Sequence, residues 1–463
     1  MYKKIFLLGL GCLFFLNVKA QNTEYKQDSL AIRRIYDEAL SRGQCYDNLR
    51  VLCKSIGARL SGSPQAEKAV FWGQEVMRKA GFDSVWLQPV KVPHWVRGNK
   101  EEGKIVLDNK NQLNVPVCAL GGSVGTPASG LKAQVIEVQN FEELASLGES
   151  KVKGKIVFFN RPMDEKLIST FRAYGGCVNQ RYAGAMHAAK YGAVGVIVRS
   201  MTLKHDEYPH TGSMGYVDSL PQIPAAAIAT SSADLLHKHL GINPKVSFYL
   251  NLSCQLLPDV DSYNVIGELE GSTNPLEYIV VGGHLDSWDK GEGAHDDGAG
   301  IVHSIEAVRL FKAVGIRPKH TLRAVLYMNE ENGAKGAAKY AKEAEEKFEK
   351  HLYAIESDAG GFSPRGISID TDNKAEFEKM MSWKPLFEPY QLTDIEKGGS
   401  GVDVGFLKKQ TIGLMGLSPD SQRYFDHHHA DTDVFEAVHQ RELELGAAAC
   451  AAWMYMLDKY AGQ

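Results

Sequence analysis

The chain has 463 residues, of which 44% are hydrophobic and 23% are charged. These are ordinary globular values, so long disordered segments are excluded, and the length indicates one large domain with an insert or two domains. The formal net charge is -4 and no run of Lys or Arg occurs. We therefore expect no nucleic-acid partner.

The N-terminus has the pattern of a secretory signal. Lys3 and Lys4 precede an apolar stretch over 5–18, and the small residue Ala20 follows. This order predicts a signal peptide at 1–20. The stretch is shorter than the roughly 20 apolar residues of a membrane span, although an uncleaved anchor and a lipid-modified Cys12 remain alternatives. No later segment is long and apolar enough to span a bilayer, so we expect a mature protein that is secreted or periplasmic.

Six cysteines remain after the predicted signal. None shows the CxxC or zinc-ribbon spacing of a metal site. We expect most of them to be buried small hydrophobes, and their pairing stays undetermined. They are Cys45, Cys53, Cys118, Cys177, Cys254 and Cys450.

The first predicted elements are two helices and a strand. Apolar residues recur at helical spacing over 28–42. A second helix is predicted to follow Ser63, a capping residue, with Pro64 in its first turn and Gly81 at its end. The segment 84–92 reads as a strand.

Residues 118–256 have a different pattern and predict a compact β-rich insert between 21–117 and 257–463. Short β-rich pieces alternate with turns that contain Gly, Pro and Ser, and one helix is predicted among them. His205 and His210 lie near acidic residues in this insert, and we interpret them as part of a solvated loop. The β-rich pieces are 133–138, 155–160 and 194–199, and the helix is 184–191.

From residue 261 onward, buried strands alternate with amphipathic helices. This order predicts an α/β fold, a mostly parallel mixed sheet flanked by helices. Active sites of such folds lie beyond the carboxyl ends of the strands. The strands are predicted at 278–281, 322–328, 352–355 and 412–417, and the helices at 301–314, 334–350 and 441–460.

Each of these strands leads into a polar cluster. The first leads to His284 and Asp286, the second to Glu330 and Glu331, and the third to Asp358. A glycine-rich turn at 293–300 carries Asp296, and a run of three histidines at 427–429 comes later. Because the carboxyl ends of parallel strands meet at one edge of a sheet, we expect these side chains to gather there.

His and carboxylate side chains without cysteine suit zinc better than calcium or an iron–sulfur cluster. Two imidazoles and three carboxylates are enough for two ions if one carboxylate bridges them, and such a pair can activate water. Of two adjacent glutamates, one can bind metal while the other acts as a base. A His-x-Asp pair or a Glu-Glu pair alone is usually a surface feature. Their co-occurrence at strand ends indicates a dimetal hydrolase.

The same segments resemble the M28 metallopeptidase family. The resemblance covers nearly all of the mature chain, most closely the carboxypeptidase Q-like (plasma glutamate carboxypeptidase) subgroup. It implies a zinc exopeptidase fold of the phosphorylase/hydrolase-like kind, and residues 118–256 resemble a protease-associated (PA) domain. The matching segments are 56–63, 284–287, 293–300, 329–333, 356–358 and 424–433.

The resemblance implies two zinc ions per chain and a role for each residue. His284 would bind one ion, Asp296 would bridge both, and Glu331 and Asp358 would complete the ligands from the middle strands. The peptide bond after Asp296 would be cis.

Two further roles belong to neighbours of these ligands. Glu330 takes the position of the general base, and Asp286 that of a carboxylate that orients the His284 ring. The family's last ligand is a His four residues before an acidic residue. This spacing selects His429 with Asp433, although it also links His427 to Asp431.

We therefore predict a secreted dizinc exopeptidase of the aminopeptidase or dipeptidase type that hydrolyses short peptides. The insert could line the cleft or support a homodimer. The alternatives are a single-zinc enzyme like glutaminyl cyclase, an M20-type dizinc peptidase and a receptor-like relative without catalysis. The motifs specify neither the substrate side chain nor the direction of cleavage.

Overall fold

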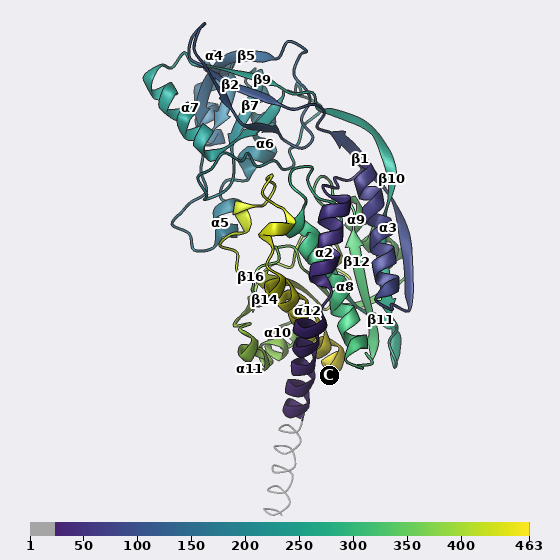
Figure 1. Cartoon of the computed structure of the whole chain (residues 1–463). Helices are drawn as coiled ribbons and strands as arrows, with labels where there is room; N and C mark the ends of the chain where they lie inside the picture. Colours follow the sequence, from purple (N-terminus) through teal and green to yellow (C-terminus); the bar gives the residue numbers. More distant parts are fainter. Residues whose placement is uncertain (1–23, 463) are drawn as a thin grey trace, which may run out of the picture.

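The computed structural model describes residues 24–462, and two bodies are visible in it (Figure 1). Each body is built around an eight-stranded sheet. The first body contains the first sheet, and the second body contains strands from residues 102–251. The predicted signal at 1–20 lies outside the described residues. Within 24–462, no helix has both the length and the apolar character needed to cross a membrane.

The centre of the first sheet consists of four parallel strands in the order β12-β11-β13-β16. All eight residues of β12 are buried, as expected for a strand that is covered on both faces. The four strands that the sequence predicted are all present. They are β11 (Asn274–His284), β12 (His320–Tyr327), β13 (Lys350–Glu356) and β16 (Gly413–Pro419).

The outer strands of this sheet include antiparallel pairs. β1 and β10 pair along their length, from Ser84 opposite Glu268 to Val96 opposite Gln255, and they run from the first body toward the second (Figure 1). The mixed α/β fold predicted from the sequence is confirmed. The outer strands are β1 (Ser84–Val96), β10 (Gln255–Leu269), β14 (Pro364–Asp370) and β15 (Asp394–Lys397).

Helices cover both faces of the first sheet. Ile279 and Val281 share one core cluster with α3, α8 and α12, whereas Val280 packs with α9 in another, as the alternation of strand side chains requires. The side chain of Ser63 caps α3 by accepting from the Ala66 amide. The helices of this body are a helix over 24–42, α2 (Cys45–Val51), α3 (Pro64–Lys79), α8 (Ala299–Ala313), α9 (Lys335–Glu346), α10 (Lys374–Met381), α11 (Lys384–Phe387) and α12 (Gln440–Tyr460).

The second sheet has the order β3-β2-β9-β5-β6-β7-β8-β4, with β5 to β8 parallel. The β-rich pieces predicted at 133–138, 155–160 and 194–199 correspond to β5, β6 and β7. The strands are β2 (Glu102–Val106), β3 (Gln112–Val115), β4 (Val117–Ala119), β5 (Leu131–Val138), β6 (Ile156–Phe159), β7 (Gly195–Arg199), β8 (Ala225–Ile228) and β9 (Ser247–Asn251). The helices are α4 (Phe141–Val152), α5 (Thr170–Gly175), α6 (Asn179–Ala189) and α7 (Thr230–Ile242).

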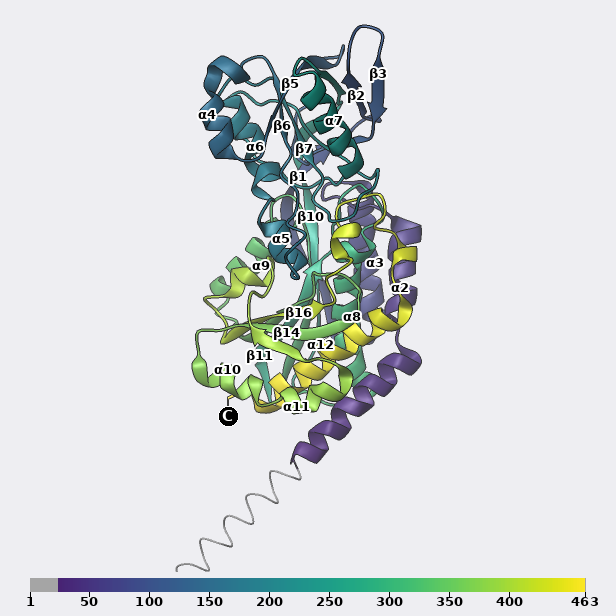
Figure 2. The same cartoon turned by 90° about the vertical axis from the view of Figure 1, so that its left-hand side faces the viewer.

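Helix α5 of the second body packs against the first body. It lies beside the segment 421–429 of the first body (Figures 1 and 2). The Thr170 hydroxyl donates to the Ser421 carbonyl at 2.9 Å, and the rings of Phe171 and Phe425 are 5.0 Å apart. The second body therefore covers the edge where the central strands of the first sheet end.

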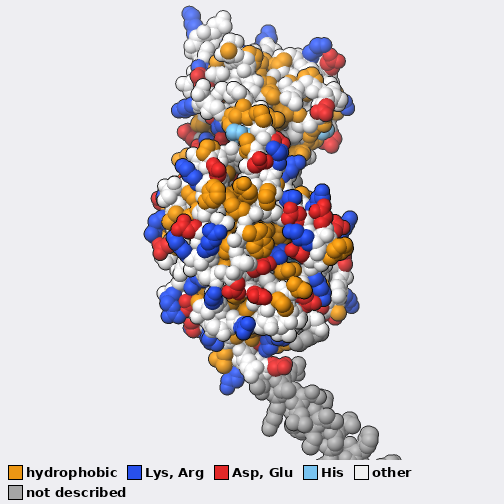
Figure 3. Space-filling view, turned by 90° about the vertical axis from the view of Figure 1, so that its right-hand side faces the viewer, with side chains coloured by type: hydrophobic (Ala, Val, Ile, Leu, Met, Phe, Trp, Pro, Cys, Tyr) orange, Lys and Arg blue, Asp and Glu red, His pale blue; other side chains and the backbone are white. Residues whose placement is uncertain are grey.

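Charged side chains of both signs are interspersed on the face shown in Figure 3, and hydrophobic side chains gather near the waist between the bodies. Most of the six cysteines were expected to be buried; all six are buried, and each is a free thiol.

Candidate metal centre

The central strands bring the predicted side chains to one edge of the first sheet. His284 is the last residue of β11 and lies opposite Tyr327, the last residue of β12. Glu330 and Glu331 follow three and four residues after that strand end. Asp358 follows the end of β13, which is in register with β11. Parallel register therefore explains why residues far apart in the chain meet here.

Asp296 lies at the centre of the cluster. Its Oδ1 is 3.2 Å from Nε2 of His284, and its Oδ2 is 3.2 Å from Nε2 of His429. All three side chains are buried. The two carboxylate oxygens thus face two different imidazoles, which is the arrangement of a bridging ligand.

Two further carboxylates complete a group around each imidazole. Asp358 Oδ1 is 3.5 Å from Nε2 of His284, and Glu331 Oε2 is 3.3 Å from Nε2 of His429. Buried oxygens of Asp296 and Asp358 lack a hydrogen-bond partner among the described residues. His284, Asp296 and Asp358 lie close enough together to hold one ion. Two imidazoles and three carboxylates are ordinary zinc ligands, so the donor set fits zinc.

The carboxylates of the cluster raise one another's pKa. Burial raises the pKa of Glu331 to about 7, and the neighbouring Asp296 adds to this rise. Burial also raises the pKa of Glu330 well above its ordinary value, with further contributions from Asp358 and Glu331. Burial lowers the pKa of His284, but Asp358 and Asp296 outweigh it and raise that pKa well above the ordinary value. Crowded negative charge of this kind is relieved by divalent cations.

The structure distinguishes the three histidines of the run. His429 contacts Asp296 and Glu331, whereas His427 has its Nδ1 3.0 Å from the Thr432 carbonyl and lies apart from the cluster. His428 stacks on His429 at 3.5 Å between ring centroids, and its Nε2 is 3.8 Å from Asp296 Oδ2. His428, and not His427, is therefore the other histidine near enough to Asp296 to be the last ligand. The spacing argument did not consider it.

Asp286 is placed differently from the expected role. Its carboxylate Oδ1 is 4.0 Å from Nδ1 of His284, while its backbone carbonyl lies 2.9 Å from the same nitrogen. The carboxylate instead accepts the amides of Asn329 at 2.6 Å and Glu330 at 3.1 Å. Asp286 thus links the ends of β11 and β12 and holds the backbone of Glu330.

The adjacent glutamates have different surroundings. The Glu331 side chain is 3% exposed and its Oε1 accepts the Trp288 amide at 3.1 Å. The Glu330 side chain is 17% exposed, and its Oε2 is 4.0 Å from Nε2 of His284. Glu330 is therefore the glutamate that remains accessible from solvent.

The glycine-rich turn is shaped by close packing around Asp297. Its carboxylate accepts the amides of His284 at 3.0 Å and Gly300 at 2.9 Å. A Cβ atom on Gly283 would lie 2.2 Å from Asp297 Oδ2, and one on Gly300 would lie 1.7 Å from the Ser357 carbonyl. The peptide bond between Asp296 and Asp297 is cis, as the resemblance implies.

Two further residues hold the backbone around Asp296. The Asp433 carboxylate accepts the amides of His295 at 2.7 Å and Asp296 at 3.1 Å. Arg59, which is fully buried, donates to the carbonyls of Leu285, Glu292 and Gly293 at 2.6–3.0 Å. Arg59 lies in the matching segment 56–63, but no role could be predicted for it, because its contacts join parts of the chain more than 200 residues apart.

The second body also contacts the cluster. The Thr211 carbonyl is 3.2 Å from Nδ1 of His429, and the Thr211 amide donates to the His429 carbonyl at 3.0 Å. His210 is 2% exposed, with its Nδ1 2.7 Å from the His428 carbonyl. The prediction that His210 belongs to a solvated loop is therefore wrong, because this loop packs against the histidine run. His205 is exposed and pairs with Asp234 at 3.1 Å.

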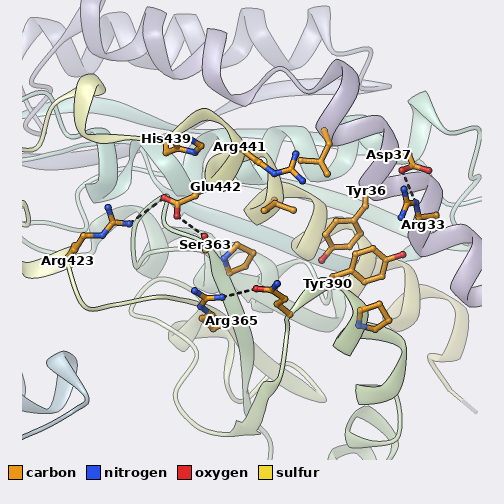
Figure 4. Close-up of a pocket in the computed structure, with 15 residues that line it drawn as sticks. Arg33, Tyr36, Asp37, Ser363, Arg365, Tyr390, Arg423, His439, Arg441 and Glu442 are labelled. Atoms are coloured by element: carbon orange, nitrogen blue, oxygen red, sulfur yellow. Dashed lines mark hydrogen bonds and ion pairs between the residues drawn. The ribbon is translucent and has the colours of Figure 1, made fainter.

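A cavity of about 700 Å³ lies away from the cluster, between the helix over 24–42, β14 and α12 (Figure 4). Tyr36 and Tyr390 stack in it at 3.9 Å. Glu442 accepts from Ser363 at 2.7 Å and pairs with Arg423 at 3.5 Å. None of the candidate ligands lines this cavity, so we place the chemistry at the cluster around Asp296.

Comparison with known proteins identifies the family. Residues 264–454 match the model of peptidase family M28. The chain is 33% identical to mouse (Mus musculus) carboxypeptidase Q over 98% of this chain and 94% of the relative. It is 35% identical to human (Homo sapiens) carboxypeptidase Q over 91% of this chain and 86% of the relative.

Solved structures agree with this result. A Peptidase M28 precursor from Shewanella amazonensis SB2B has a TM-score of 0.89 and 32% sequence identity, covering 95% of this chain and 98% of its own. The zinc aminopeptidase BSAP from Bacillus subtilis shares the fold, with a TM-score of 0.64 and 18% identity over 92% of this chain and 97% of its own. The chain thus belongs to peptidase family M28 and is a carboxypeptidase Q-like zinc metallopeptidase.

Proposed function

We propose that the protein is a two-zinc exopeptidase that hydrolyses short peptides. The observation that carries the proposal is the position of Asp296, whose two oxygens each lie 3.2 Å from a different imidazole. One shared carboxylate between two ligand groups is what a pair of ions requires. All five predicted ligand side chains lie in this one cluster. No observation favours the single-zinc or receptor-like alternatives.

The five side chains would hold the ions as two groups that share Asp296. His284 and Asp358 would complete one group, and His429 and Glu331 the other. A zinc pair bound there supplies a lowered pKa for water and polarisation of the scissile carbonyl.

Glu330 is proposed as the general base. It takes a proton from the attacking water at a carboxylate oxygen and returns the proton to the leaving amine. Its exposure and its position 4.0 Å from Nε2 of His284 support this role. Asp286 acts on Glu330 by holding its amide at 3.1 Å, which makes Asp286 a positioning residue.

The place of action and the domain division also belong to the proposal. The signal-like order of residues 1–20 supports export from the cytoplasm. The separate sheet of the second body supports an insert of the protease-associated kind, flanked by the two parts of the peptidase domain.

A Glu330→Gln variant tests the proposed function. It should keep the zinc content of the wild type and lose turnover by about 100-fold or more, because general acid–base catalysis contributes roughly 10²–10⁴-fold. Zinc would be measured by elemental analysis, and turnover on a panel of dipeptides and blocked peptides. Glu396→Gln, an exposed glutamate of β15, is the matched control. Wild-type turnover in Glu330→Gln would refute the role of Glu330.

A further inference from the structure

Four arginine side chains line the cavity of about 700 Å³ that is shown in Figure 4. Three of them are exposed and the fourth is half-buried, so a ligand can reach each guanidinium from solvent. Only two carboxylates line the same cavity, and like charges that are brought together repel one another. The lining therefore carries an excess of positive charge. The arginines are Arg33, Arg365, Arg423 and Arg441, and the carboxylates are those of Asp37 and Glu442.

The two carboxylates of the lining already have partners. Asp37 Oδ1 lies 2.8 Å from Nε of Arg33 in a close ion pair. Glu442 Oε1 accepts the Ser363 hydroxyl at 2.7 Å, while its Oε2 is 3.5 Å from Nη2 of Arg423. A charge-assisted hydrogen bond is shorter than this, about 2.7–2.9 Å. Arg423 therefore keeps N–H donors that no close carboxylate occupies.

Arg365 and Arg441 have still weaker partners. Arg365 donates to Gln391 Oε1 at 3.2 Å and to Asp420 Oδ2 at 3.4 Å. No carboxylate among residues 24–462 forms an ion pair with Arg441. An arginine has five N–H donors, so most donors of both guanidiniums are available to a ligand.

The arginines are spread along the cavity. In the view of Figure 4, Arg423 and Arg33 lie toward opposite ends, and Arg441 and Arg365 lie on opposite sides between them. Helix α12 begins next to them at Gln440 without a side-chain cap, and the start of a helix adds partial positive charge. A ligand that satisfies several of these groups therefore needs negative charge at more than one point.

The cavity also has an apolar wall. The ring of Tyr36 is 2% exposed and stacks on that of Tyr390 at 3.9 Å between centroids. Leu40, Pro389 and Leu445 line the cavity as well. Its volume lies within the roughly 300–1,000 Å³ of small-molecule sites. The cavity therefore suits an organic molecule better than a bare inorganic ion.

Aromatic rings separate this cavity from the metal cluster. The guanidinium carbon of Arg423 is 4.7 Å from the centroid of the Phe362 ring. Phe362 in turn stacks on His295 at 4.2 Å, and His295 precedes Asp296 in the chain. The cavity is therefore a site of its own, behind the ligand-bearing turn.

We propose that this cavity binds a small organic anion that has an apolar body and at least two negative charges. Carboxylate and phosphate groups share the required chemistry, because the planar fork of arginine binds either of them with two hydrogen bonds. The proposal does not depend on the peptidase function, since none of the candidate metal ligands lines the cavity.

The test is calorimetric titration of the zinc-loaded full chain with three probes that share a benzene ring. Isophthalate carries two carboxylates, phenyl phosphate carries a phosphate, and benzamide is neutral. At least one of the anions should bind at one molecule per chain with a Kd of about 1 mM or tighter, and the tighter one identifies the preferred group. This binding should weaken as NaCl is added, because salt screens exposed charges. Benzamide should not bind measurably.

The double variant Arg365→Met, Arg441→Met should weaken binding of the anion by about tenfold or more, because it removes charge-assisted hydrogen bonds. It should keep the melting temperature of the wild type, since neither side chain is buried. Arg78→Met, which replaces an exposed arginine of α3 outside the cavity, is the matched control and should bind as the wild type does.

Three results would overturn the proposal. The first is a wild type that binds neither anion, and the second is equal binding of benzamide and the anions; both are read without any variant. The third is unchanged binding in a folded double variant, which would place the anion elsewhere, such as at the zinc ions.

Discussion

Asp296 is held in place through its backbone as well as through its side chain. Its amide donates to Asp433 at 3.1 Å, and the next residue, Asp297, accepts the amides of His284 and Gly300. Because the side-chain oxygens make none of these contacts, both remain directed at the two imidazoles. This separation of backbone anchoring from ligand oxygens is what a bridging carboxylate needs.

The histidine run gives a prediction at the scale of single residues. His429→Ala should lower zinc binding from two ions to about one per chain, because it removes a ligand from one of the two groups. His427→Ala should keep both ions, since His427 contacts the Thr432 carbonyl instead. Zinc content after dialysis against a weak chelator measures the difference. Loss of an ion in His427→Ala with retention in His429→Ala would reverse the assignment.

The candidate ligands could be named from the sequence because each follows a strand end or lies in a glycine-rich turn. The contacts that hold these ligands in place could not be predicted from the sequence. Asp433 was expected beside His429, but it accepts the amides of His295 and Asp296 instead. Such contacts depend on how a loop folds back on itself, and sequence spacing does not determine that.

At the scale of elements, α12 carries a buried carboxylate against the start of α2. Glu444 is 3% exposed and accepts the Tyr46 amide at 3.1 Å. A Cβ atom on Gly43 would lie 2.1 Å from its Oε2, so the carboxyl group is closely enclosed. Burial raises its pKa to about 7. Ionisation of this group therefore opposes folding at neutral pH.

The pKa of Glu444 gives a prediction about stability. The unfolded chain releases this proton near pH 4.3, while the folded chain keeps it until about pH 7. The folded state binds more protons between these values, so this contribution to stability falls as pH rises from about 4.5 to 7.

Glu444→Gln should not lose stability in this way, because it has no proton to release. Relative to the wild type, it should therefore be more stable at pH 7.5 than the comparison at pH 5 predicts, by on the order of 2 kcal/mol. Its melting temperature relative to wild type should rise between pH 5 and pH 7.5. A constant difference across this range would contradict the assignment, and Glu396→Gln again serves as the exposed control.

Elements with strong local signals were predicted well. Ser63, Pro64 and Gly81 marked α3 (Pro64–Lys79), and continuous apolar runs marked the four central strands. The second half of β1 and the strands β10, β14 and β15 were missed. Their partly exposed residues lack a clean apolar pattern, and pairing with neighbouring strands of the sheet decides their conformation.

At the scale of the whole molecule, the second body contacts the candidate metal centre. Thr211 contacts His429 through both its amide and its carbonyl, and Arg181 lies directly behind the same ring. The sequence allowed the insert over 118–256 to line the cleft, but it singled out none of these contact residues. The contacts come from single residues on separate loops and a helix of the second body, and such residues form no motif.

The central claim is a pair of zinc ions bridged by Asp296. Metal-free protein would be titrated with Zn²⁺ while bound zinc and dipeptide hydrolysis are measured on the same samples. We predict two zinc ions per chain at saturation, and an Asp296→Asn variant that loses both binding and hydrolysis, because each ion loses the shared ligand. Saturation at one zinc per chain with full hydrolysis would contradict the account.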